Sequence, residues 1–276
     1  MPELPEAETI VRGLRATVVG RTIDRAEVLK PDILRVSKRA FGPKVRGRRI
    51  EAIARRAKNV IIHLDGARVI AVNLGMTGKL LPFSKPPRGA ARPTHPAVRF
   101  RFRDGGILVF DDTRRFGTVE CLDDQAWSER SAAMGPEPLD PAYTPTDLHE
   151  ATSRSRAPIR SWLLDQKKIA GVGNIYAAEA LYLAGIHPLR EARSLDDRDA
   201  RALHASVRDV LTEAIDAGGT TIRDYRTAEG GEGEYARQLH VYGREGEPCH
   251  RCEAAVERTV LSNRSAFFCP TCQPGP

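Results

Sequence analysis

Four cysteines near the end of the chain have the spacing of metal ligands. They form two CxxC pairs separated by sixteen residues, namely Cys249, Cys252, Cys269 and Cys272. Thiolates in this arrangement match tetrahedral zinc, and four protein ligands leave no open position for a substrate. The pattern predicts one structural zinc ion, with two disulfides or redox CxxC pairs as the alternatives. The residues between the pairs indicate a hairpin with Ser262, Asn263 and Arg264 at its tip.

A second group of residues that can do chemistry opens the chain, where Met1 precedes Pro2 and Glu3. Removal of Met1 would leave Pro2 with a secondary α-amine, and α-amines have a pKa of about 8. On the order of a tenth of them is unprotonated at pH 7, so Pro2 can attack an electrophilic sugar carbon as a nucleophile. The neighbouring carboxyl group of Glu3 can act as general acid to the sugar ring oxygen. The alternative is a rigid N-terminus in which this acid only caps the first helix.

Short apolar segments in the first half of the chain predict the sheet that must position these residues. Segments 60–64, 69–74, 98–103 and 107–110 are rich in β-branched and aromatic residues and are bounded by turn sequences. In the third segment, strict alternation predicts a core face and a charged face, formed by Val98, Phe100 and Phe102 against Arg99, Arg101 and Arg103. Ahead of the sheet, residues 6–19 have the apolar period of an amphipathic helix that ends at Gly20.

The second half of the chain, after about residue 125, is predicted to be helical. Three prolines within 135–143 indicate a linker. Helices are predicted over 159–169, 175–184 and 195–217, the last with Ser194 as its N-cap. The glycine-rich turn 171–174 lies between the first two helices, and a second glycine-rich segment, 228–234, indicates a loop.

The charge of the chain is modest in total and uneven in distribution. There are 43 basic and 36 acidic residues, which gives a formal net charge of +7 over 276 residues. Residues 35–58 contain ten basic residues and one acid, and further basic clusters lie at 99–103 and 154–168. The alternative for any one cluster is an ordinary solvated surface. Together, the clusters predict a cleft in which both domains contact phosphates, with an affinity that depends on salt. No apolar run is long enough to span a bilayer, which argues against a membrane protein.

Motifs along the whole chain occur in the order of a known family. They are MPELPE (1–6), RRAK (55–58), LGMTG (74–78), DDTRRFG (111–117), GPEPL (135–139), the long segment 163–188, VYGREGEPC (241–249) and the terminal cysteine pattern. Together they closely resemble the formamidopyrimidine-DNA glycosylase family, bacterial enzymes that remove 8-oxoguanine and ring-opened purines from DNA. The resemblance implies an α+β fold. Its parts are an N-terminal antiparallel β-sandwich with flanking helices (1–125), a linker (126–145), a helical helix-two-turns-helix domain (146–240) and a zinc-ribbon finger (241–276).

The resemblance also implies catalytic roles at the matching positions. Pro2 is the Schiff-base nucleophile, Glu3 is the general acid, and Glu6 is a further, supporting acid. Lys58 is assigned to the β-elimination step and to phosphate contact, with a plain phosphate-binding cation as the alternative. Arg264 is assigned to δ-elimination and phosphate contact. Because an arginine does not readily give up a proton, phosphate contact is the better-founded role for Arg264.

Further positions match residues that bind DNA in the family. Met76, Arg114 and Phe116 match the triad that fills the gap left by the extruded nucleotide, where an adaptable wedge, a hydrogen-bonding cation and a stacking ring are suited to the task. The other expected DNA contacts are His95, Arg154, Arg156 and Asn174, the last at a helix N-terminus that suits a phosphate. The loop 220–235 is expected to cover the extruded base.

The sequence departs from the family pattern at several of these places. The family usually has proline where Thr113 stands and histidine where Asn73 stands, which leaves the loop behind the triad in question. Glu232 and Glu234 put two acids into the covering loop, where a basic or neutral residue is usual. Base preference is therefore the least determined property.

These observations predict a bifunctional DNA glycosylase and AP lyase for oxidised purines, acting by an N-terminal proline Schiff base and β,δ-elimination in base excision repair. The expected partner is damaged double-stranded DNA, the expected cofactor is one structural zinc ion, and a monomer in the bacterial cytoplasm, associated with the nucleoid, is expected. One alternative is the related endonuclease VIII-like glycosylase for oxidised pyrimidines, against which Leu4 argues because that branch typically has glycine there. Another is a non-catalytic damaged-DNA-binding zinc-ribbon protein, which would need none of Pro2, Glu3 and Lys58.

Overall fold

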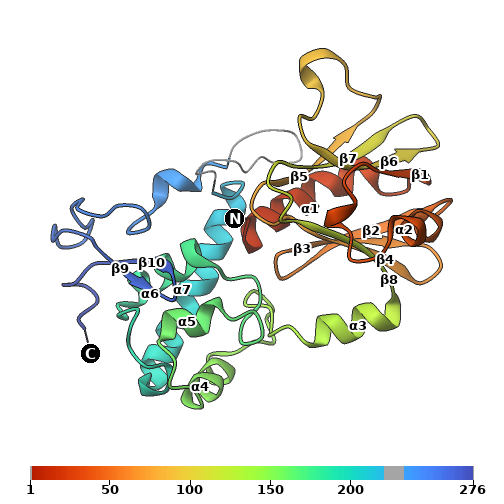
Figure 1. Cartoon of the computed structure of the whole chain (residues 1–276). Helices are drawn as coiled ribbons and strands as arrows, with labels where there is room; N and C mark the ends of the chain where they lie inside the picture. Colours follow the sequence, from red (N-terminus) through yellow and green to blue (C-terminus); the bar gives the residue numbers. More distant parts are fainter. Residues whose placement is uncertain (1, 221–232, 276) are drawn as a thin grey trace. The chain divides into compact units, whose positions relative to one another are not determined.

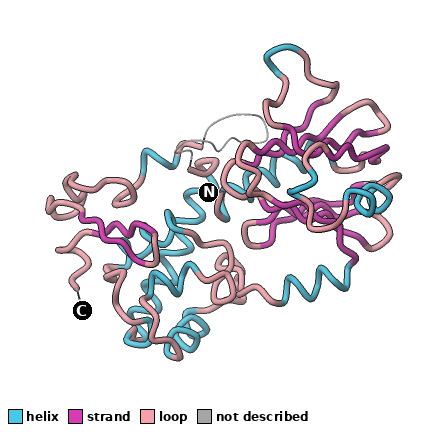
Figure 2. The backbone as a smooth tube through the Cα atoms, viewed as in Figure 1, coloured by secondary structure: helices cyan, strands magenta, loops and turns pink. Residues whose placement is uncertain are grey.

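The computed structural model describes residues 2–220 and 233–275, and the chain divides into two compact units. Unit 1 comprises Met1–Ala133 and Ala217–Glu234, and unit 2 comprises Met134–Asp216 and Tyr235–Pro276. Figure 1 labels the elements of each unit, and Figure 2 shows that strands dominate the first unit and helices the second.

Unit 1 is built on two four-stranded sheets. The first has the order β1-β6-β7-β5, with β1 Ile23–Val28, β5 Gly78–Phe83, β6 Pro96–Phe102 and β7 Ile107–Asp112. The second has the order β2-β3-β4-β8, with β2 Ile50–Arg56, β3 Asn59–Leu64, β4 Arg68–Asn73 and β8 Thr118–Asp123. Every pairing is antiparallel, and the four segments predicted as strands correspond to β3, β4, β6 and β7.

The two sheets of unit 1 enclose one apolar core, to which both contribute alternate side chains. From the second sheet come, among others, Ile53, Val60, Ile62, Ile70 and Val72. The alternation predicted for β6 is confirmed, because Val98, Phe100 and Phe102 are buried in this core while Arg99 and Arg101 lie partly exposed on the opposite face. The predicted antiparallel β-sandwich is therefore correct, and burial of its alternating residues explains why the sheets pack face to face.

Three helices flank the sandwich: α1 Leu4–Val18, α2 Lys38–Val45 and α3 Asp124–Ala132. Helix α1 buries the apolar stripe predicted from the sequence, including Ile10, Val11 and Leu14, and packs against β2 and β3. It begins two residues earlier than predicted because Glu3 serves as its N-cap, with Pro5 in the first turn, where a missing N–H costs nothing. Two short 3-10 turns, Pro31–Ile33 and Gly89–Ala91, complete the unit.

Unit 2 contains four α-helices in the part of the chain that is described: α4 Pro145–Ser153, α5 Ile159–Leu164, α6 Asn174–Ala184 and α7 Asp197–Asp216. Helix α6 packs against both α5 and α7 and is buried on nearly every side. The predicted N-cap of the last helix was wrong: Ser194 lies in a 3-10 turn, and the carboxylate of Asp196 accepts the hydrogen bond from Asp199 N at 2.8 Å instead.

The first helix predicted in this half of the chain is shorter than expected, since α5 ends at Leu164 rather than at residue 169. The amide side chain of Gln166 closes the turn that follows. Its Nε2 donates to Val172 O at 2.9 Å, and its Oε1 accepts from Gly171 N at 2.9 Å. These bonds satisfy backbone groups of the glycine-rich turn, so the chain gains more by turning here than by continuing the helix.

A two-stranded hairpin, β9 Glu257–Leu261 and β10 Arg264–Phe268, lies in unit 2 and packs against α6. Its turn consists of Ser262 and Asn263, which have φ values of 51° and 59°. Positive φ at both central residues is what a two-residue type I′ turn requires. The predicted hairpin is confirmed, and Arg264 follows its turn directly and is exposed.

The compact units differ from the predicted domain limits. Helix α3 lies in the segment predicted as a linker, because it packs against β4 and β8 and extends unit 1 to Ala133. The segment predicted as a separate finger belongs to the same unit as the helices, and the described ends of Ala217–Glu234 belong with the sandwich. None of the described helices is long and apolar enough to cross a membrane.

Candidate active site and metal centre

The N-terminal residues proposed to do the chemistry are held by the first turn of α1. Pro2 and Glu3 are both buried. Glu6, which is 1% exposed, folds back so that its Oε2 accepts a hydrogen bond from Glu3 N at 2.7 Å. This is the reciprocal half of a capping box, and it fixes the backbone that carries Pro2 and Glu3. The capping arrangement and the catalytic one are therefore compatible, because the carboxylates that begin the helix lie within four residues of the candidate nucleophile in the chain.

Glu6 also ties the N-terminus to a distant segment of unit 1. Its second oxygen, Oε1, accepts a hydrogen bond from Thr220 N at 2.8 Å. Thr220 pairs with Glu234 in an isolated antiparallel bridge, and a Cβ atom on Gly233 would lie only 2.2 Å from Gly219 O. The two ends of the expected covering loop are thus closed against each other beside Glu6. The rest of that loop, with Glu232, lies outside the described residues.

Lys58 lies in the two-residue turn between β2 and β3, where Ala57 has a φ of 52°. Strand β2 runs antiparallel to α1: Arg15 Nε donates to Ile53 O at 2.8 Å, and two residues further along the strand Arg55 contacts Glu8 at 3.2 Å. The strand therefore approaches the start of α1 as it reaches Lys58. This geometry brings Lys58 toward the N-terminal end of α1, where Pro2 and Glu3 lie.

Several cations of the basic segment 35–58 are engaged within the fold. The total charge of this segment therefore overstates the charge that is available to a ligand. Arg55 is largely buried and pairs with Glu8. Arg56 donates from Nε to Ser131 Oγ at 3.1 Å and from Nη2 to Ser131 O at 3.0 Å, and so fastens α3 to the sandwich. Arg48 contacts Asp65 at 3.7 Å. Part of the cluster thus serves the fold, and Lys58 is set among cations that already have structural roles.

Two loops expose the side chains expected to fill the gap in a duplex. Met76, between β4 and β5, is 37% exposed, and Phe116, between β7 and β8, is 58% exposed. The guanidinium of Arg114 lies 4.7 Å from the centroid of the Phe116 ring. Large apolar side chains held in water at loop tips contribute little to the core, so packing does not explain these residues. Their exposure supports the triad predicted from the sequence.

A buried carboxylate joins these two loops. Asp112 is 1% exposed; its Oδ1 accepts from Thr77 Oγ1 at 2.5 Å and its Oδ2 from Gly117 N at 2.8 Å. Thr77 Oγ1 in turn accepts from Arg114 N at 3.0 Å. Gly75 has a φ of 61°, and a Cβ there would lie 2.4 Å from Gly117 N. Hydrogen bonds to one buried carboxylate therefore connect the two loops. The sequence analysis missed Asp112 and Thr77, although both lie inside the quoted motifs.

The departures from the family pattern have local roles in this structure. Asn73 Nδ2 donates to Asn59 Oδ1 at 3.0 Å, and its Oδ1 accepts from Gly75 N at 3.0 Å. It thus connects the strand that follows Lys58 to the loop of Met76. Both polar ends of the Asn73 side chain therefore have hydrogen-bond partners.

His95 is fixed by its backbone and flanked by two hydroxyl groups. His95 N donates to Asp111 Oδ1 at 2.6 Å, and its Nδ1 lies 2.9 Å from Thr94 Oγ1 and 3.3 Å from Thr113 Oγ1. The side chain of Thr113 thus reaches the ring of a residue expected to contact DNA. A proline at that position would lack this contact.

Asn174 is the first residue of α6, and its side chain contacts another part of unit 2. Asn174 Oδ1 accepts from Arg160 Nη2 at 2.6 Å, and Nδ2 donates to Ser265 O at 3.1 Å. Arg160 is 1% exposed and also donates to Leu261 O at 3.2 Å and Ser265 O at 2.8 Å. Burial lowers the pKa of its guanidinium from the usual value. Arg160, counted with the surface cations in the sequence, is a buried connection between Asn174 and the hairpin that carries Arg264.

The remaining expected DNA contacts of unit 2 lie on its surface. Arg154 follows the last residue of α4, and Arg156 lies two residues further on; both are exposed, as is Arg264. Because these three cations are exposed, they can contact phosphates without a desolvation penalty. None of them lies in a buried site that would favour proton transfer.

The four cysteines of unit 2 meet the requirements of a tetrahedral metal site. Their Sγ atoms all lie within 4.8 Å of one another, with Cys249 and Cys272 at 3.9 Å and Cys252 and Cys269 at 3.4 Å. A zinc tetrahedron with Zn–S bonds of about 2.3 Å has edges of about 3.8 Å. Two backbone amides point at sulfur: Arg251 N lies 3.4 Å from Cys249 Sγ, and Cys272 N lies 3.4 Å from Cys269 Sγ. The donor set fits zinc, and none of the cysteines is in a disulfide.

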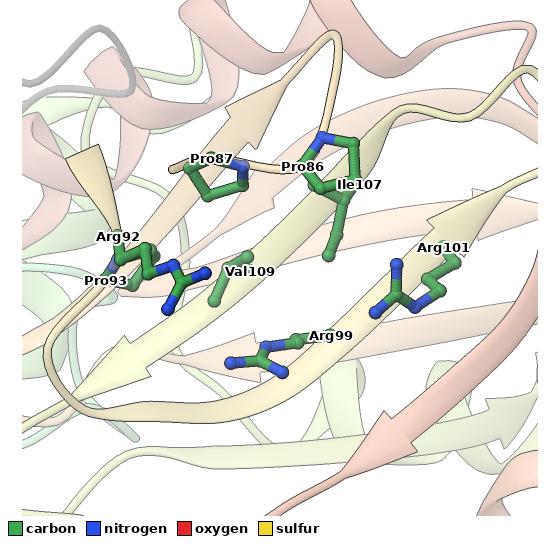
Figure 3. Close-up of a pocket in the computed structure, with 8 residues that line it drawn as sticks. All are labelled: Pro86, Pro87, Arg92, Pro93, Arg99, Arg101, Ile107 and Val109. Carbon is green, nitrogen blue, oxygen red and sulfur yellow. The ribbon is translucent and has the colours of Figure 1, made fainter. Parts of the chain in front are cut away.

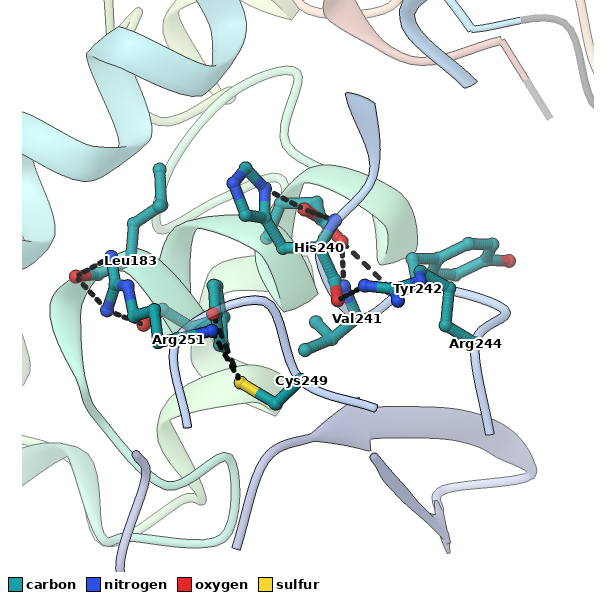
Figure 4. A network of polar contacts seen from close by, with 9 residues as sticks. Leu183, His240, Val241, Tyr242, Arg244, Cys249 and Arg251 are labelled. Atoms are coloured by element: carbon teal, nitrogen blue, oxygen red, sulfur yellow. Dashed lines mark hydrogen bonds and ion pairs between the residues drawn. The ribbon is translucent and has the colours of Figure 1, made fainter. Parts of the chain in front are cut away.

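A buried carboxylate anchors the start of this metal-binding region. Glu179, in α6, is fully buried and accepts hydrogen bonds from the backbone amides of His240 (2.7 Å), Val241 (3.0 Å) and Tyr242 (2.8 Å). Figure 4 shows this network beside Cys249. The signal for Glu179 in the sequence is a single acid inside the apolar helical segment 175–184, which is costly unless the acid has buried partners.

Comparison with known proteins gives full-length matches. Three family models match the chain: "Formamidopyrimidine-DNA glycosylase N-terminal domain" over residues 1–119, "Formamidopyrimidine-DNA glycosylase H2TH domain" over 134–226, and "Zinc finger found in FPG and IleRS" over 246–275. The formamidopyrimidine-DNA glycosylase of Chloroflexus aurantiacus is 46% identical over 274 residues, covering 99% of this chain and 98% of that protein. That of Heliobacterium modesticaldum is 41% identical over 276 residues, covering 99% and 100%.

Solved structures agree with this. A mutant of the Lactococcus lactis protein in complex with Fapy-dG-containing DNA matches with a TM-score of 0.92 at 33% identity, covering 99% of this chain and 100% of that one. The MutM (Fpg) protein of Thermus thermophilus matches with a TM-score of 0.88 at 38% identity, covering 100% of both chains. The wild-type Lactococcus lactis protein in complex with DNA containing an oxidized pyrimidine matches with a TM-score of 0.90 at 32% identity, covering 99% and 100%.

Proposed function

This chain belongs to the formamidopyrimidine-DNA glycosylase family, and from that premise we propose how its own residues divide the reaction. The protein is a DNA glycosylase of base excision repair that removes oxidised purines from damaged double-stranded DNA and has AP lyase activity. It holds one structural zinc ion in the four-cysteine site. The assignment of single residues rests on the geometry described above.

Pro2 is the nucleophile and Glu3 the general acid. The Pro2 nitrogen, once freed by removal of Met1, forms a bond to C1′ as the bond from C1′ to the damaged base breaks. Glu3 protonates the ring oxygen O4′, the sugar opens, and an iminium links Pro2 to the sugar. The observation that supports this assignment is the bond from Glu3 N to Glu6, which fixes the backbone of Glu3 at a buried helix start.

Elimination then removes the sugar. Loss of a proton from C2′ breaks the bond from C3′ to its phosphate, and a second elimination breaks the bond from C5′ to the other phosphate, which leaves a one-nucleotide gap. Lys58, near the start of α1, is proposed to assist the first elimination and to contact phosphate. Arg264 is proposed to contact phosphate, because its exposed guanidinium offers several N–H donors in a geometry that matches a phosphate.

The nucleotide must leave the stack before this chemistry, and the exposed loops of unit 1 are suited to fill the gap. Met76 and Phe116 supply apolar wedges, and Arg114 supplies donors to the orphaned base. His95, Arg154, Arg156 and Asn174 are proposed to contact the DNA backbone. We expect the protein to act as a monomer in the bacterial cytoplasm, on nucleoid DNA.

Borohydride trapping on a duplex with an abasic site tests the nucleophile. Wild type with Met1 removed should form a covalent adduct, Pro2→Gly with Met1 retained should reduce its yield at least about a hundredfold, and Pro5→Ala, within the first turn of α1, is the matched control. Glu3→Gln should slow base release more than trapping of a preformed abasic site, because an abasic sugar is already partly ring-opened. Equal adduct formation by wild type and Pro2→Gly would exclude Pro2 as nucleophile.

A second substrate class has one observation in its favour. The Lactococcus lactis relative is known in complex with DNA containing an oxidized pyrimidine. Excision rates on duplexes with 8-oxoguanine and with an oxidised pyrimidine compare the two classes directly. We expect the purine to be preferred, and a reversed order would assign this chain to the pyrimidine-excising branch in function.

A further inference from the structure

A cavity of about 330 Å³ lies on unit 1, on the outer face of the first sheet. Its floor consists of Ile107 and Val109, whose side chains point away from the core that receives Leu108 and Phe110. Ile107 and Val109 are nevertheless only 3% and 1% exposed. The connection 84–95 between β5 and β6 folds over them, and its prolines, among them Pro87, line the cavity (Figure 3). An outward sheet face is thus covered to form a walled apolar floor.

Three guanidinium groups surround this floor, from Arg92, Arg99 and Arg101. The register of β6 and β7 pairs Arg99 with Val109 and Arg101 with Ile107, so each arginine stands beside one floor residue. Arg92 comes from the covering connection and faces them across the cavity. The arrangement combines an apolar base with cations from two chain segments.

One carboxylate offsets part of this charge. Glu27 on β1 forms an ion pair with Arg101 and lies 4.0 Å from Arg99. The hydrogen bond from Arg101 lowers the pKa of Glu27, so this carboxylate stays ionised near neutral pH. The four groups together carry a net charge of about +2. Glu27 also orients the two arginines of β6, which reduces the entropy that a ligand must remove to use them.

We propose that this cavity binds a small organic phosphate of the mononucleotide class. A guanidinium matches a phosphate through two parallel hydrogen bonds and can also stack on a flat ring. The prolines that line the cavity above the buried floor of Ile107 and Val109 offer the ring an apolar surface, and these rigid walls limit the ligand to one compact group. The volume is at the small end of the range for ligand sites, which suits a mononucleotide rather than a polymer.

Calorimetric titration of the full-length zinc-loaded protein with AMP tests the proposal. Saturable binding is expected, at least about tenfold tighter for AMP than for adenosine or inorganic phosphate, because both parts of the ligand contribute. The double variant Arg92→Ala/Arg99→Ala should weaken AMP binding at least about tenfold. The matched control is Arg88→Ala/Arg103→Ala, which removes the same charge from exposed arginines outside the cavity.

Three results would overturn the site. They are no saturable binding of AMP at millimolar concentration, equal weakening in both double variants, and displacement of AMP by an undamaged DNA duplex. The last two would identify general attraction of anions to a basic surface. None of these results depends on base excision, so failure of the proposed reaction and failure of this site are distinguishable.

A different observation concerns the metal centre. The hydroxyl group of Tyr182, on α6, lies 3.3 Å from Cys249 Sγ, and the Tyr182 side chain is fully buried. The Arg251 guanidinium lies 4.6 Å from the centroid of the Tyr182 ring, and its Nη1 donates to Tyr182 O at 3.2 Å. Arg251 N is also one of the two amides that point at sulfur. Tyr182, Arg251 and Cys249 therefore form one connected group, of which Figure 4 labels Arg251 and Cys249.

We infer that Tyr182 is a positioning residue for the zinc ion and slows its loss. A hydrogen bond between a hydroxyl group and a ligand sulfur orients that sulfur without occupying a coordination position. Because the ring is buried on α6 and covered by Arg251, the hydroxyl group is oriented before the metal binds. The bond also connects the helix that begins at Asn174 directly to the metal centre.

Tyr182→Phe removes only the hydroxyl, and release of zinc to a chromogenic chelator measures the effect. Release should be about tenfold faster than in wild type, and the sulfur-to-metal charge-transfer bands of the cobalt-substituted protein should shift. Tyr176→Phe, a buried tyrosine on the same helix, is the matched control and should behave as wild type. Unchanged release and an unchanged cobalt spectrum in Tyr182→Phe, or equal changes in both variants, would contradict the inference.

Discussion

Two exposed structures carry side chains proposed to meet DNA, and they are stabilised in different ways. In unit 1 the loops of Met76 and Phe116 stand on a sandwich with a large apolar core, and buried Asp112 joins them. In unit 2 the hairpin that carries Arg264 belongs to a region with few buried apolar residues, four cysteines and buried Arg160. A small element cannot bury enough apolar surface to be stable alone. In unit 2 a metal ion and the buried guanidinium of Arg160 therefore stabilise the hairpin.

This difference determines how each structure should fail. A loop on a sheet loses one hydrogen bond at a time, and the core below it remains. A metal-held hairpin loses several constraints together when one ligand is removed, because the remaining three no longer hold the ion. The variants that follow compare these two kinds of failure.

Loss of one metal ligand should have the largest effect. Cys269→Ser removes a buried thiolate, so we expect loss of zinc, disorder of the hairpin and at least about a hundredfold weaker binding of a lesion duplex. Zinc content and fluorescence anisotropy measure the two effects. Cys121→Ser, a buried cysteine in β8 far from the metal ligands in sequence, is the control and should retain the full zinc content. Normal DNA affinity in a zinc-free Cys269→Ser protein would show that the metal does not hold the hairpin.

The matching change in unit 1 is Asp112→Ala, which leaves Thr77 Oγ1 and Gly117 N without their buried acceptor. The free energy of unfolding should fall by about 2 to 4 kcal/mol, since buried donors lose their partner. DNA affinity should fall only about tenfold, because the sheet continues to carry the loops. Denaturant unfolding and anisotropy report these values. Asp104→Ala, an exposed turn residue that accepts from Gly106 N, should change stability by less than about 1 kcal/mol. A larger loss of affinity in Asp112→Ala than in Cys269→Ser would reverse the comparison.

Arg160 separates the contribution of the buried ion from that of the metal. Arg160→Met keeps an unbranched side chain but removes the guanidinium and its bonds to Asn174 Oδ1 and Ser265 O, so we expect full zinc content with about fivefold to tenfold weaker DNA binding. The loss should be accompanied by a smaller slope of affinity against salt, because fewer phosphates are contacted. Arg258→Met, on an exposed face of the same hairpin, is the control. Loss of zinc from Arg160→Met would show that ion and metal act as one unit.

The sequence predicted what depends on periodicity and on ligand spacing. Alternation in β6 gave the correct core face, and the cysteine spacing gave the metal centre, because both are local patterns with one physical solution. It did not predict Arg160 or Glu179 as buried groups. Burial of a charge is decided by partners far away in the chain, 101 and 105 residues for the hairpin carbonyls that Arg160 contacts, and a residue type carries no such information.

The error in the end of one predicted helix has a local origin instead. The helix that ends at Leu164 has a continuing apolar pattern, but the side chain of Gln166 satisfies the turn around Gly171 and ends it. The proposed catalytic residues have no local pattern that predicts their role. No period or spacing identifies Pro2, and only the motif context separates a nucleophile from an ordinary capped helix start.

The smallest expected effect concerns Asn73. It tests whether this asparagine performs the role of the histidine that is usual in the family or weakens the site. Asn73→Ala removes the bonds to Asn59 Oδ1 and from Gly75 N, both partly exposed to solvent, so the free energy of unfolding should fall by about 1 kcal/mol. Because Asn59 follows Lys58 and Gly75 precedes Met76, excision should slow by about twofold to threefold with zinc content unchanged. Thermal unfolding and single-turnover excision measure these effects. Asn73→His introduces the residue usual in the family and should restore most of the rate if position 73 acts by bridging the two turns. A rate in Asn73→Ala equal to that of wild type would mean that the sheet alone positions both loops, so that even this junction depends on the core of unit 1.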